Sequence, residues 1–289
     1  MNNKKSSMVY LLMVLPALIL FFAFHTFPVL QGVFYSFTNW RGYGDWDFIG
    51  LRNYIHVFKD GRALDAYFFT IKFAIVSTIL VNIFSLLIAL GLNAKIKFKS
   101  TLRAVYFMPN ILSILIVGFI FNYILSIFVP TIAQNLGITF LATSILGNPD
   151  LAWVGVVIVA VWQAVAFNTI LYLAGLSTIS DDLYEASNLD GANKWQEFWK
   201  ITFPLIAPFF TINMVLAMKN FLMVFDHIMG LTGGGPGRAT ESISILIYRS
   251  GFTGGEFAYQ SANAVIYFIV IVGFSVFQIR QLQKREVEM

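Results

Sequence analysis

Long apolar runs alternate with short polar connections along the chain. Six runs are long enough to cross a bilayer, which takes about 20 apolar residues in an α-helix. They cover residues 9–35, 67–93, 105–128, 151–176, 205–229 and 259–279. None has the alternating pattern of a membrane β-barrel strand. The pattern predicts an all-α polytopic membrane protein, with six transmembrane helices in a single transmembrane domain over residues 1–289.

Residues 129–150 could be read as a seventh span, because they contain no Lys or Arg. Pro130, Gly137 and the Gly-Asn-Pro sequence at 147–149 argue against a continuous membrane helix. We therefore expect a short helix outside the membrane, at its surface.

The first apolar run imitates a signal peptide. It continues to about Phe37 without a small-x-small cleavage site, so we interpret it as an uncleaved first span.

The composition agrees with a membrane protein. Of the 289 residues, 58% are hydrophobic and 12% are charged, about half the charged share of a soluble domain. The absence of cysteine excludes disulfides, thiolate metal sites and Cys nucleophiles. His25, His56 and His227 are too scattered for a metal site. No span holds paired carboxylates, a His cluster or a Ser–His arrangement, which disfavours a membrane enzyme.

The basic residues indicate the orientation, because cytoplasmic loops of membrane proteins carry an excess of Lys and Arg. With six spans and an internal N-terminus, eleven basic residues lie inside and six outside. The inner ones are Lys4, Lys5, Lys95, Lys97, Lys99, Arg103, Lys194, Lys200, Arg280, Lys284 and Arg285, and the outer ones are Arg41, Arg52, Lys59, Arg62, Arg238 and Arg249. Both termini are therefore predicted to be cytoplasmic.

The densest polar stretch, residues 180–204, lies in a predicted cytoplasmic connection between the fourth and fifth spans. Ser180 is a suitable N-cap for a short helix with two aspartates in its first turn. Gly191 is expected to end that helix. A second amphipathic helix with Trp195 on its apolar face should follow. Amphipathicity alone also fits an ordinary interfacial loop, since Trp commonly lies at the membrane surface.

The order of residues in this elbow, which we define as residues 180–204, resembles the EAA loop of ABC-importer permeases. The matching positions are Glu185, Ala186, Gly191, Ile201 and Pro204. Ser187 replaces the second alanine of the motif, Phe203 its usual leucine, and Ser180 the proline of sugar-importer relatives. These departures leave the glycine and the carboxylate in place.

Four further segments resemble the carbohydrate-uptake branch of this family. They are FIGLRNY (48–54), RAVYFMPN (103–110), YLAGLSTI (172–179) and LTGGGPGRAT (231–240). They occur in the family's order, and together with the elbow they cover nearly the whole chain. The last resembles a signature of the maltose/oligosaccharide permease-like subunit. The chain is therefore similar to a permease of a bacterial or archaeal cytoplasmic membrane.

The resemblance implies that the elbow is a coupling helix held by a cytoplasmic ATPase. The expected coupling residues are Leu183, Glu185, Ala186, Ser187, Leu189, Asp190, Gly191 and Trp195. The chain has no P-loop, because the Gly233–Gly235 run leads to Pro236 and not to a phosphate-binding lysine. We therefore expect no cofactor in this chain, with ATP and Mg on the ATPase. The implied partners are a second homologous permease, two ATPase subunits, an extracytoplasmic solute-binding protein and the lipid bilayer.

Polar residues inside the spans indicate where a solute could bind, because such residues usually face a cavity. Asn213, Asn220 and His227 repeat every seven residues, which places them within about 40° on one helical face. Amides bond sugar hydroxyls, and aromatic rings pack on sugar C–H groups. The predicted substrate-binding residues are Gln163, Phe167, Asn168, Asn220 and Phe221; all but Asn168 fall where related sugar permeases line their cavity. Membrane amides also serve as contacts between helices, worth about 1 kcal/mol, so both roles stay open.

The preferred substrate is an oligosaccharide. By resemblance, the loops at 38–66 and 231–258 would dock the solute-binding protein. A glycerol-phosphate importer is the alternative, because Lys219 could face an anion. A stand-alone secondary transporter is disfavoured, since such carriers generally need intramembrane carboxylates or His relays and the spans offer only Asp226. No nucleic-acid partner is expected.

Overall fold

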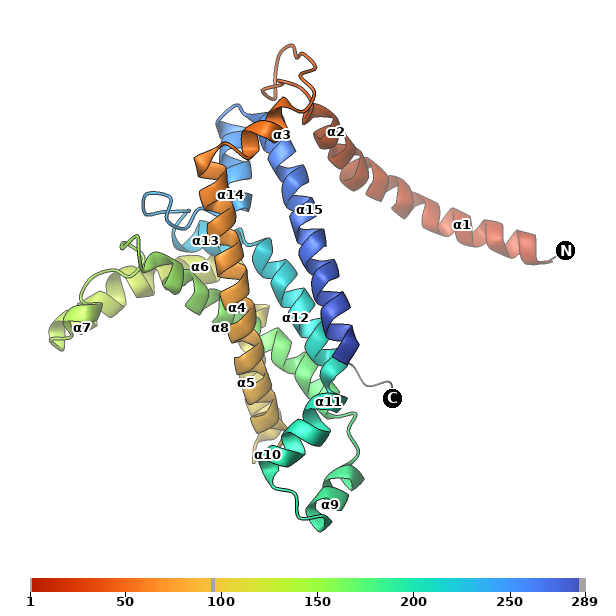
Figure 1. Ribbon diagram of the computed structural model, residues 1–289, viewed down its shortest axis with the longest axis vertical. Coiled ribbons are helices and arrows are strands. Elements are labelled where there is room, and N and C mark those ends of the chain that lie inside the picture. The colour runs from red at the N-terminus through yellow and green to blue at the C-terminus, as the bar shows by residue number, and fades with distance from the viewer. Residues whose placement is uncertain (1, 95–96, 286–289) are drawn as a thin grey trace. The chain divides into compact units, whose positions relative to one another are not determined.

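The computed structural model describes residues 2–94 and 97–285 (Figure 1). Over these residues the chain is helical, with no β-strand and one isolated antiparallel bridge between Thr38 and Phe48. A cytoplasmic location was also predicted for parts of the chain that lie outside the described residues, namely Met1, Lys95 and residues 286–289. The chain divides into two compact units, residues 1–64 with 246–269 and residues 65–245 with 270–289.

Within the described residues, five helices are long and apolar enough to cross a membrane. They cover Tyr10–Tyr35, Gly61–Asn93, Ile114–Asn135, Ala152–Leu176 and Phe257–Leu282. A sixth crossing results if Lys194–Leu205 and Ala207–Leu222, which meet at a bend of 69°, form one broken span. The predicted all-α class is confirmed, with five apolar membrane-length helices, or six if the bent pair is one span.

The first unit begins with a long apolar rod. It consists of α1 (Asn2–Phe21), a π-helical turn (Phe22–Thr26) and α2 (Phe27–Tyr35). The most apolar window of this rod has no residue buried within the chain. An apolar surface of this extent must be covered by lipid or by another protein.

Short elements follow the rod in the first unit. They are α3 (Arg52–Val57), the start of α4 (Gly61–Asn93), the end of α14 (Ile243–Tyr248), a π-helical turn (Arg249–Thr253) and the start of α15 (Phe257–Leu282). An aromatic cluster joins the end of the rod to the start of α15: the Trp40 ring stacks on Tyr35 at 4.1 Å between centroids and meets Phe257 edge-on at 5.0 Å. The backbone N–H of Ala258 donates to the Trp40 carbonyl.

The second unit contains the main core. Its elements are most of α4, α5 (Lys99–Ile111), α6 (Ile114–Tyr123), a π-helical turn (Ile124–Phe128), α7 (Val129–Asn135), a 3₁₀ turn (Thr139–Leu141), α8 (Ala152–Leu176), α9 (Asp181–Leu189), α10 (Lys194–Glu197), a π-helical turn (Phe198–Thr202), α11 (Phe203–Leu205), α12 (Ala207–Leu222), α13 (Asp226–Leu231), the start of α14, the end of α15 and a 3₁₀ turn (Gln283–Arg285). Phe73, Val156 and Leu222 are buried at its centre. Helices α4, α8 and α12 therefore form the scaffold of this unit.

The third predicted span, at 105–128, was placed too early. Helix α5 ends at Ile111, and Leu112 takes an extended conformation with ψ of 140°. Pro109 contributes, because its ring lacks an N–H and disfavours a continuous helix. The apolar helix resumes at Ile114 and runs to Asn135. The membrane-length segment is therefore shifted by about two turns from the predicted one.

The expectation of a separate surface helix in residues 129–150 was also wrong. Pro130 lies in the first turn of α7, where a missing N–H breaks no hydrogen bond, and α7 continues the span from α6. The continuous helix ends before Gly137, and a 3₁₀ turn at Thr139–Leu141 is the only helical piece in the rest of this described stretch.

Candidate functional site

The elbow begins with a capped helix. The Ser180 side chain accepts a hydrogen bond from the backbone N–H of Asp182 at 3.3 Å, as predicted, and Asp181 and Asp182 occupy the first turn of α9. Both carboxylates therefore lie at the positive end of the helix dipole. The cap fixes where α9 begins.

Gly191 ends α9 in a Schellman motif. Its φ is +77°, a left-handed conformation that residues with a Cβ rarely adopt. The N–H of Gly191 donates to the Asn188 carbonyl at 3.1 Å, and the N–H of Ala192 donates to the Ser187 carbonyl at 3.0 Å. These are the two bonds that define the motif. Within the part of the chain that the structure describes, a Cβ on Gly191 would meet no atom within 4 Å, so the requirement for glycine is conformational and not steric.

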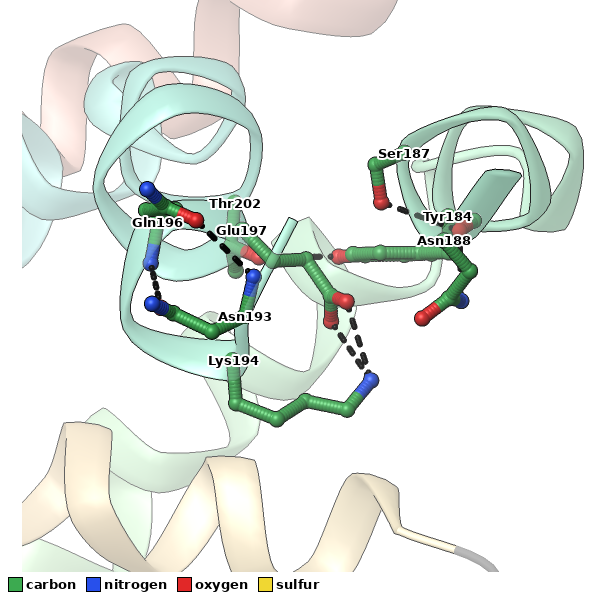
Figure 2. Close-up of polar contacts among 8 residues, drawn as sticks. All are labelled: Tyr184, Ser187, Asn188, Asn193, Lys194, Gln196, Glu197 and Thr202. Carbon is green, nitrogen blue, oxygen red and sulfur yellow. Dashed lines mark hydrogen bonds and ion pairs between the residues drawn. The ribbon is translucent and has the colours of Figure 1, made fainter. Parts of the chain in front are cut away.

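The second half of the elbow is held by its own polar contacts, which Figure 2 shows. Asn193 and Gln196 form a capping box, each side chain accepting from the other's backbone N–H at 2.9 Å. Lys194 pairs with Glu197 at 2.9 Å. The Tyr184 hydroxyl bonds the Thr202 hydroxyl at 3.1 Å and so joins α9 to the π-helical turn after α10. The two halves are thus fixed to one another.

The elbow exposes apolar side chains. Leu189 is 90% exposed and Trp195 is 71% exposed. The other predicted coupling residues at the surface are Leu183, Glu185, Ala186, Asp190 and Gly191. Ser187 differs, because it is buried and its hydroxyl donates to the Tyr184 carbonyl at 2.9 Å. An exposed Leu and Trp on a rigid polar elbow fit a contact with another protein.

All five predicted substrate residues line one cavity in the second unit. Its volume is about 540 Å³. Gln163, Phe167 and Asn168 reach it from α8, and Asn220 and Phe221 from α12. The lining also includes Asn110, Lys219, Asp226 and His227. The cavity combines amides with aromatic rings, the chemistry expected for a polar solute with C–H faces.

The predicted continuous face of Asn213, Asn220 and His227 does not exist. Helix α12 ends at Leu222, and His227 belongs to α13 after a break. Asn213 is fully buried, and its Nδ2 donates to the Asn168 carbonyl at 3.3 Å. The break changes the direction of the chain, so Asn220 and His227 both line the cavity. Asn213 instead joins α12 to α8.

Gln163 connects three elements. Its Nε2 donates to the carbonyls of Pro109 at 3.2 Å and Leu112 at 2.9 Å, which lie at the break between α5 and α6. Its Oε1 lies 3.1 Å from Nε2 of His227 on α13. The carboxamide is 5% exposed and has no donor to spare in this arrangement. Gln163 therefore holds the wall of the cavity together, the helix-contact role that the sequence left open.

Asn168 leaves one acceptor unpaired beside the cavity. Its Nδ2 donates to the Ala164 carbonyl at 2.8 Å, whereas its buried Oδ1 has no partner within the described part of the chain. A buried unpaired acceptor costs about 1–3 kcal/mol. A hydrogen-bond donor placed beside the Asn168 Oδ1 would therefore lower the free energy of the protein.

Helix α13 is held against α6 by a contact between two glycines. A Cβ on Gly118 would lie 2.8 Å from Cα of Gly230, and a Cβ on Gly230 would lie 2.9 Å from Cα of Gly118. The Asn122 side chain also donates to the Leu231 carbonyl. The backbones of α6 and α13 therefore touch, and this contact places Asp226 and His227 at the cavity.

Comparison with known proteins agrees with this architecture. Residues 81–287 match the family described as binding-protein-dependent transport system inner membrane component. The chain is 40% identical over 271 residues to the multiple sugar-binding transport system permease protein MsmF of Streptococcus mutans, with 93% of each chain covered. It is 36% identical over 285 residues to the probable starch degradation products transport system permease protein AmyD of Thermoanaerobacterium thermosulfurigenes, covering 99% of this chain and 97% of the relative.

A solved structure shares the fold. The bacterial alginate ABC transporter in complex with alginate pentasaccharide-bound periplasmic protein contains a chain with a TM-score of 0.82. The match covers 98% of both chains at 23% identity. The chain therefore belongs to the family of binding-protein-dependent transport system inner membrane components, the permeases of ABC importers, and is a multi-pass membrane protein.

Proposed function

We propose that this permease carries an oligosaccharide, delivered by an external solute-binding protein, and that a separate ATPase drives it. The cavity carries the proposal. Amides of Asn168 and Asn220 are suited to sugar hydroxyls, and the exposed ring of Phe167 to sugar C–H faces, while Phe221 is buried in the wall against Phe73. Its volume of about 540 Å³ suits a few sugar rings. The sugar-transport descriptions of the two relatives support the same substrate class.

The elbow is the contact with the ATPase. ATP and Mg bind to the two ATPase subunits, and the exposed Leu189 and Trp195 insert into them from the cytoplasmic side. Movement of the ATPases then shifts the permease between inward and outward openings. A ligand shifts such an equilibrium only by its difference in affinity for the two states. Since Tyr184 and Asn193 stiffen the elbow, force on its tip reaches α12 without being lost in local bending.

The remaining partners follow from the exposed surfaces. The exposed rod Tyr10–Tyr35 is covered by lipid and by a second homologous permease. The whole chain then acts as one permease domain, with both termini in the cytoplasm. Glycerol phosphate is the second candidate substrate, because Lys219 lines the cavity and would attract a phosphate.

Substitutions at the cavity test the substrate assignment. Phe167→Ala and Asn220→Ala should each raise the half-saturating oligosaccharide concentration about tenfold, because each removes an interaction of roughly 1.4 kcal/mol with bound solute. The measurement is uptake of labelled tri- to pentasaccharides into vesicles that hold the whole importer.

The matched control is Ile170→Ala. Ile170 lies on the same helix as Phe167 and has the same 41% exposure, but it does not line the cavity. Its uptake should equal that of the unmodified importer. The assignment is wrong if both cavity variants carry every sugar normally. The second candidate would be established if the unmodified importer took up labelled glycerol phosphate but no sugar, and if Lys219→Gln abolished that uptake.

A further inference from the structure

Helix α3 (Arg52–Val57) and its flanking residues Leu51, Phe58 and Lys59 present three different faces. At helical spacing, positions three and four residues apart lie on the same face. Asn53 and Val57 form one such face, Leu51, Ile55 and Phe58 a second, and Arg52, His56 and Lys59 a third. The first face is packed, whereas every residue of the second and third is exposed. The fold thus uses one face of α3 and leaves its apolar face open. On the basic face the His56 ring lies 4.9 Å from the Tyr259 ring, while Arg52 and Lys59 stay exposed.

The packed face ties α3 to the end of the first span. Asn53 donates to the carbonyls of Ser36 at 2.9 Å and Thr38 at 2.8 Å, directly after α2. The Tyr54 hydroxyl bonds the Ser36 hydroxyl at 2.6 Å. At its other end α3 is separated from the membrane-length helix α4 by only residues 58–60, as Figure 1 shows. Both ends of α3 therefore adjoin membrane-length helices.

The apolar face is a surface for lipid. Leu51, Ile55 and Phe58 are each more than half exposed. Large apolar side chains that share one face at the mouth of two spans are at the depth where interfacial helices insert. If this face lay in water, its exposed apolar surface would cost free energy.

The basic face borders a hollow on the same helix. The hollow has a volume of about 690 Å³ and is lined by Ile49, Leu51, Arg52, Asn53, Ile55, His56 and Lys59. Neither Arg52 nor Lys59 has a side-chain partner within the described ranges. The nearest carboxylate in sequence, Asp60, instead accepts from the Tyr259 hydroxyl at 2.7 Å and from the Arg62 N–H at 2.9 Å. Two unpaired cations thus face a space with an apolar rim.

We propose that α3 is an interfacial anchor that binds an anionic phospholipid. The lipid phosphate lies in the hollow beside Arg52 and Lys59, and its acyl chains lie against Ile55 and Phe58. Cations near the membrane surface attract anionic headgroups, and the apolar face supplies the depth. The occupant is a lipid and not a soluble anion, because the cations adjoin an apolar face fixed at the mouth of two spans.

Depth measurement tests the apolar face. The chain has no cysteine, so Ile55→Cys gives one nitroxide site in this subunit. In the assembled importer in phosphatidylglycerol-containing vesicles, with cysteine-free partner subunits, this label should collide several-fold more with oxygen than with a water-soluble nickel complex. Tyr43→Cys, an exposed position in the preceding loop, should give the reverse ratio. A label at position 55 that is water-accessible until the binding protein is added would overturn the proposal and assign the face to protein docking.

Lipid retention tests the basic face. Native mass spectrometry of the whole importer should show that the double variant Arg52→Gln with Lys59→Gln needs roughly 30-fold more phosphatidylglycerol for half-maximal retention. The charge-conserving pair Arg52→Lys with Lys59→Arg, and the control Arg41→Gln in the same loop, should retain it normally, and inorganic phosphate should not displace it. Equal retention of phosphatidylglycerol and phosphatidylcholine, or no loss in the double variant, would refute the anionic lipid site.

Discussion

Gly191→Val is expected to abolish uptake while the permease still inserts in the membrane at normal levels. The cause is the φ of +77° at Gly191, which a β-branched residue adopts only with strain. The strained variant loses the Schellman bonds that end α9, so Leu189 and Trp195 no longer share a fixed geometry. Substrate-stimulated ATP hydrolysis in proteoliposomes should fall at least tenfold together with uptake.

Gly191→Asn is the matched control, because Asn tolerates the left-handed conformation and open space surrounds the position. This variant should keep most of its activity. Normal coupled hydrolysis in the valine variant would show that the elbow's shape does not matter. Equal failure of both variants would mean that bulk, and not backbone conformation, is what Gly191 must avoid.

Gly118→Ala is expected to give the largest loss of stability. The new Cβ would lie 2.8 Å from Cα of Gly230, a backbone atom that cannot rotate away. Overpacking of this kind costs about 1–3 kcal/mol. The purified importer should therefore unfold at a temperature lower by about 2–4 °C for each kcal/mol lost. The shift is measurable by thermal unfolding in detergent.

Gly91→Ala provides the comparison. Gly91 is also inside a helix, but its added Cβ would meet no atom of the described residues within 4 Å, so alanine should be neutral or mildly stabilising there. If Gly118→Ala unfolds at the same temperature as Gly91→Ala, then α6 and α13 are not in backbone contact. The placement of Asp226 and His227 at the cavity would then need another cause.

Most of the membrane segments were predictable because a bilayer imposes a length on apolar helices. The fourth span shows this: residues 151–176 were expected and Ala152–Leu176 is found. The start of the elbow was predictable for a local reason, since the Ser180 cap depends only on neighbouring residues. Both features depend on residues that are close together in the sequence.

The break between α12 and α13 was not predictable, because tertiary contacts hold it. Residues 223–225 contain neither Gly nor Pro, yet α12 ends before them, and the contact of Gly118 with Gly230 keeps α13 in place. The predicted seven-residue stripe failed there. The role of Gln163 was hidden for the same reason, as its carbonyl partners at Pro109 and Leu112 are more than fifty positions away.

The side of the membrane on which Leu189 lies is the most direct test of the account. A membrane-impermeant maleimide on Leu189→Cys, the sole cysteine of this chain, should react in inverted vesicles stripped of ATPase. It should fail to react in intact cells and be blocked when the ATPase is restored. Labelling from outside intact cells, or labelling that the ATPase leaves unchanged, would contradict the proposal that this elbow connects the permease to its motor.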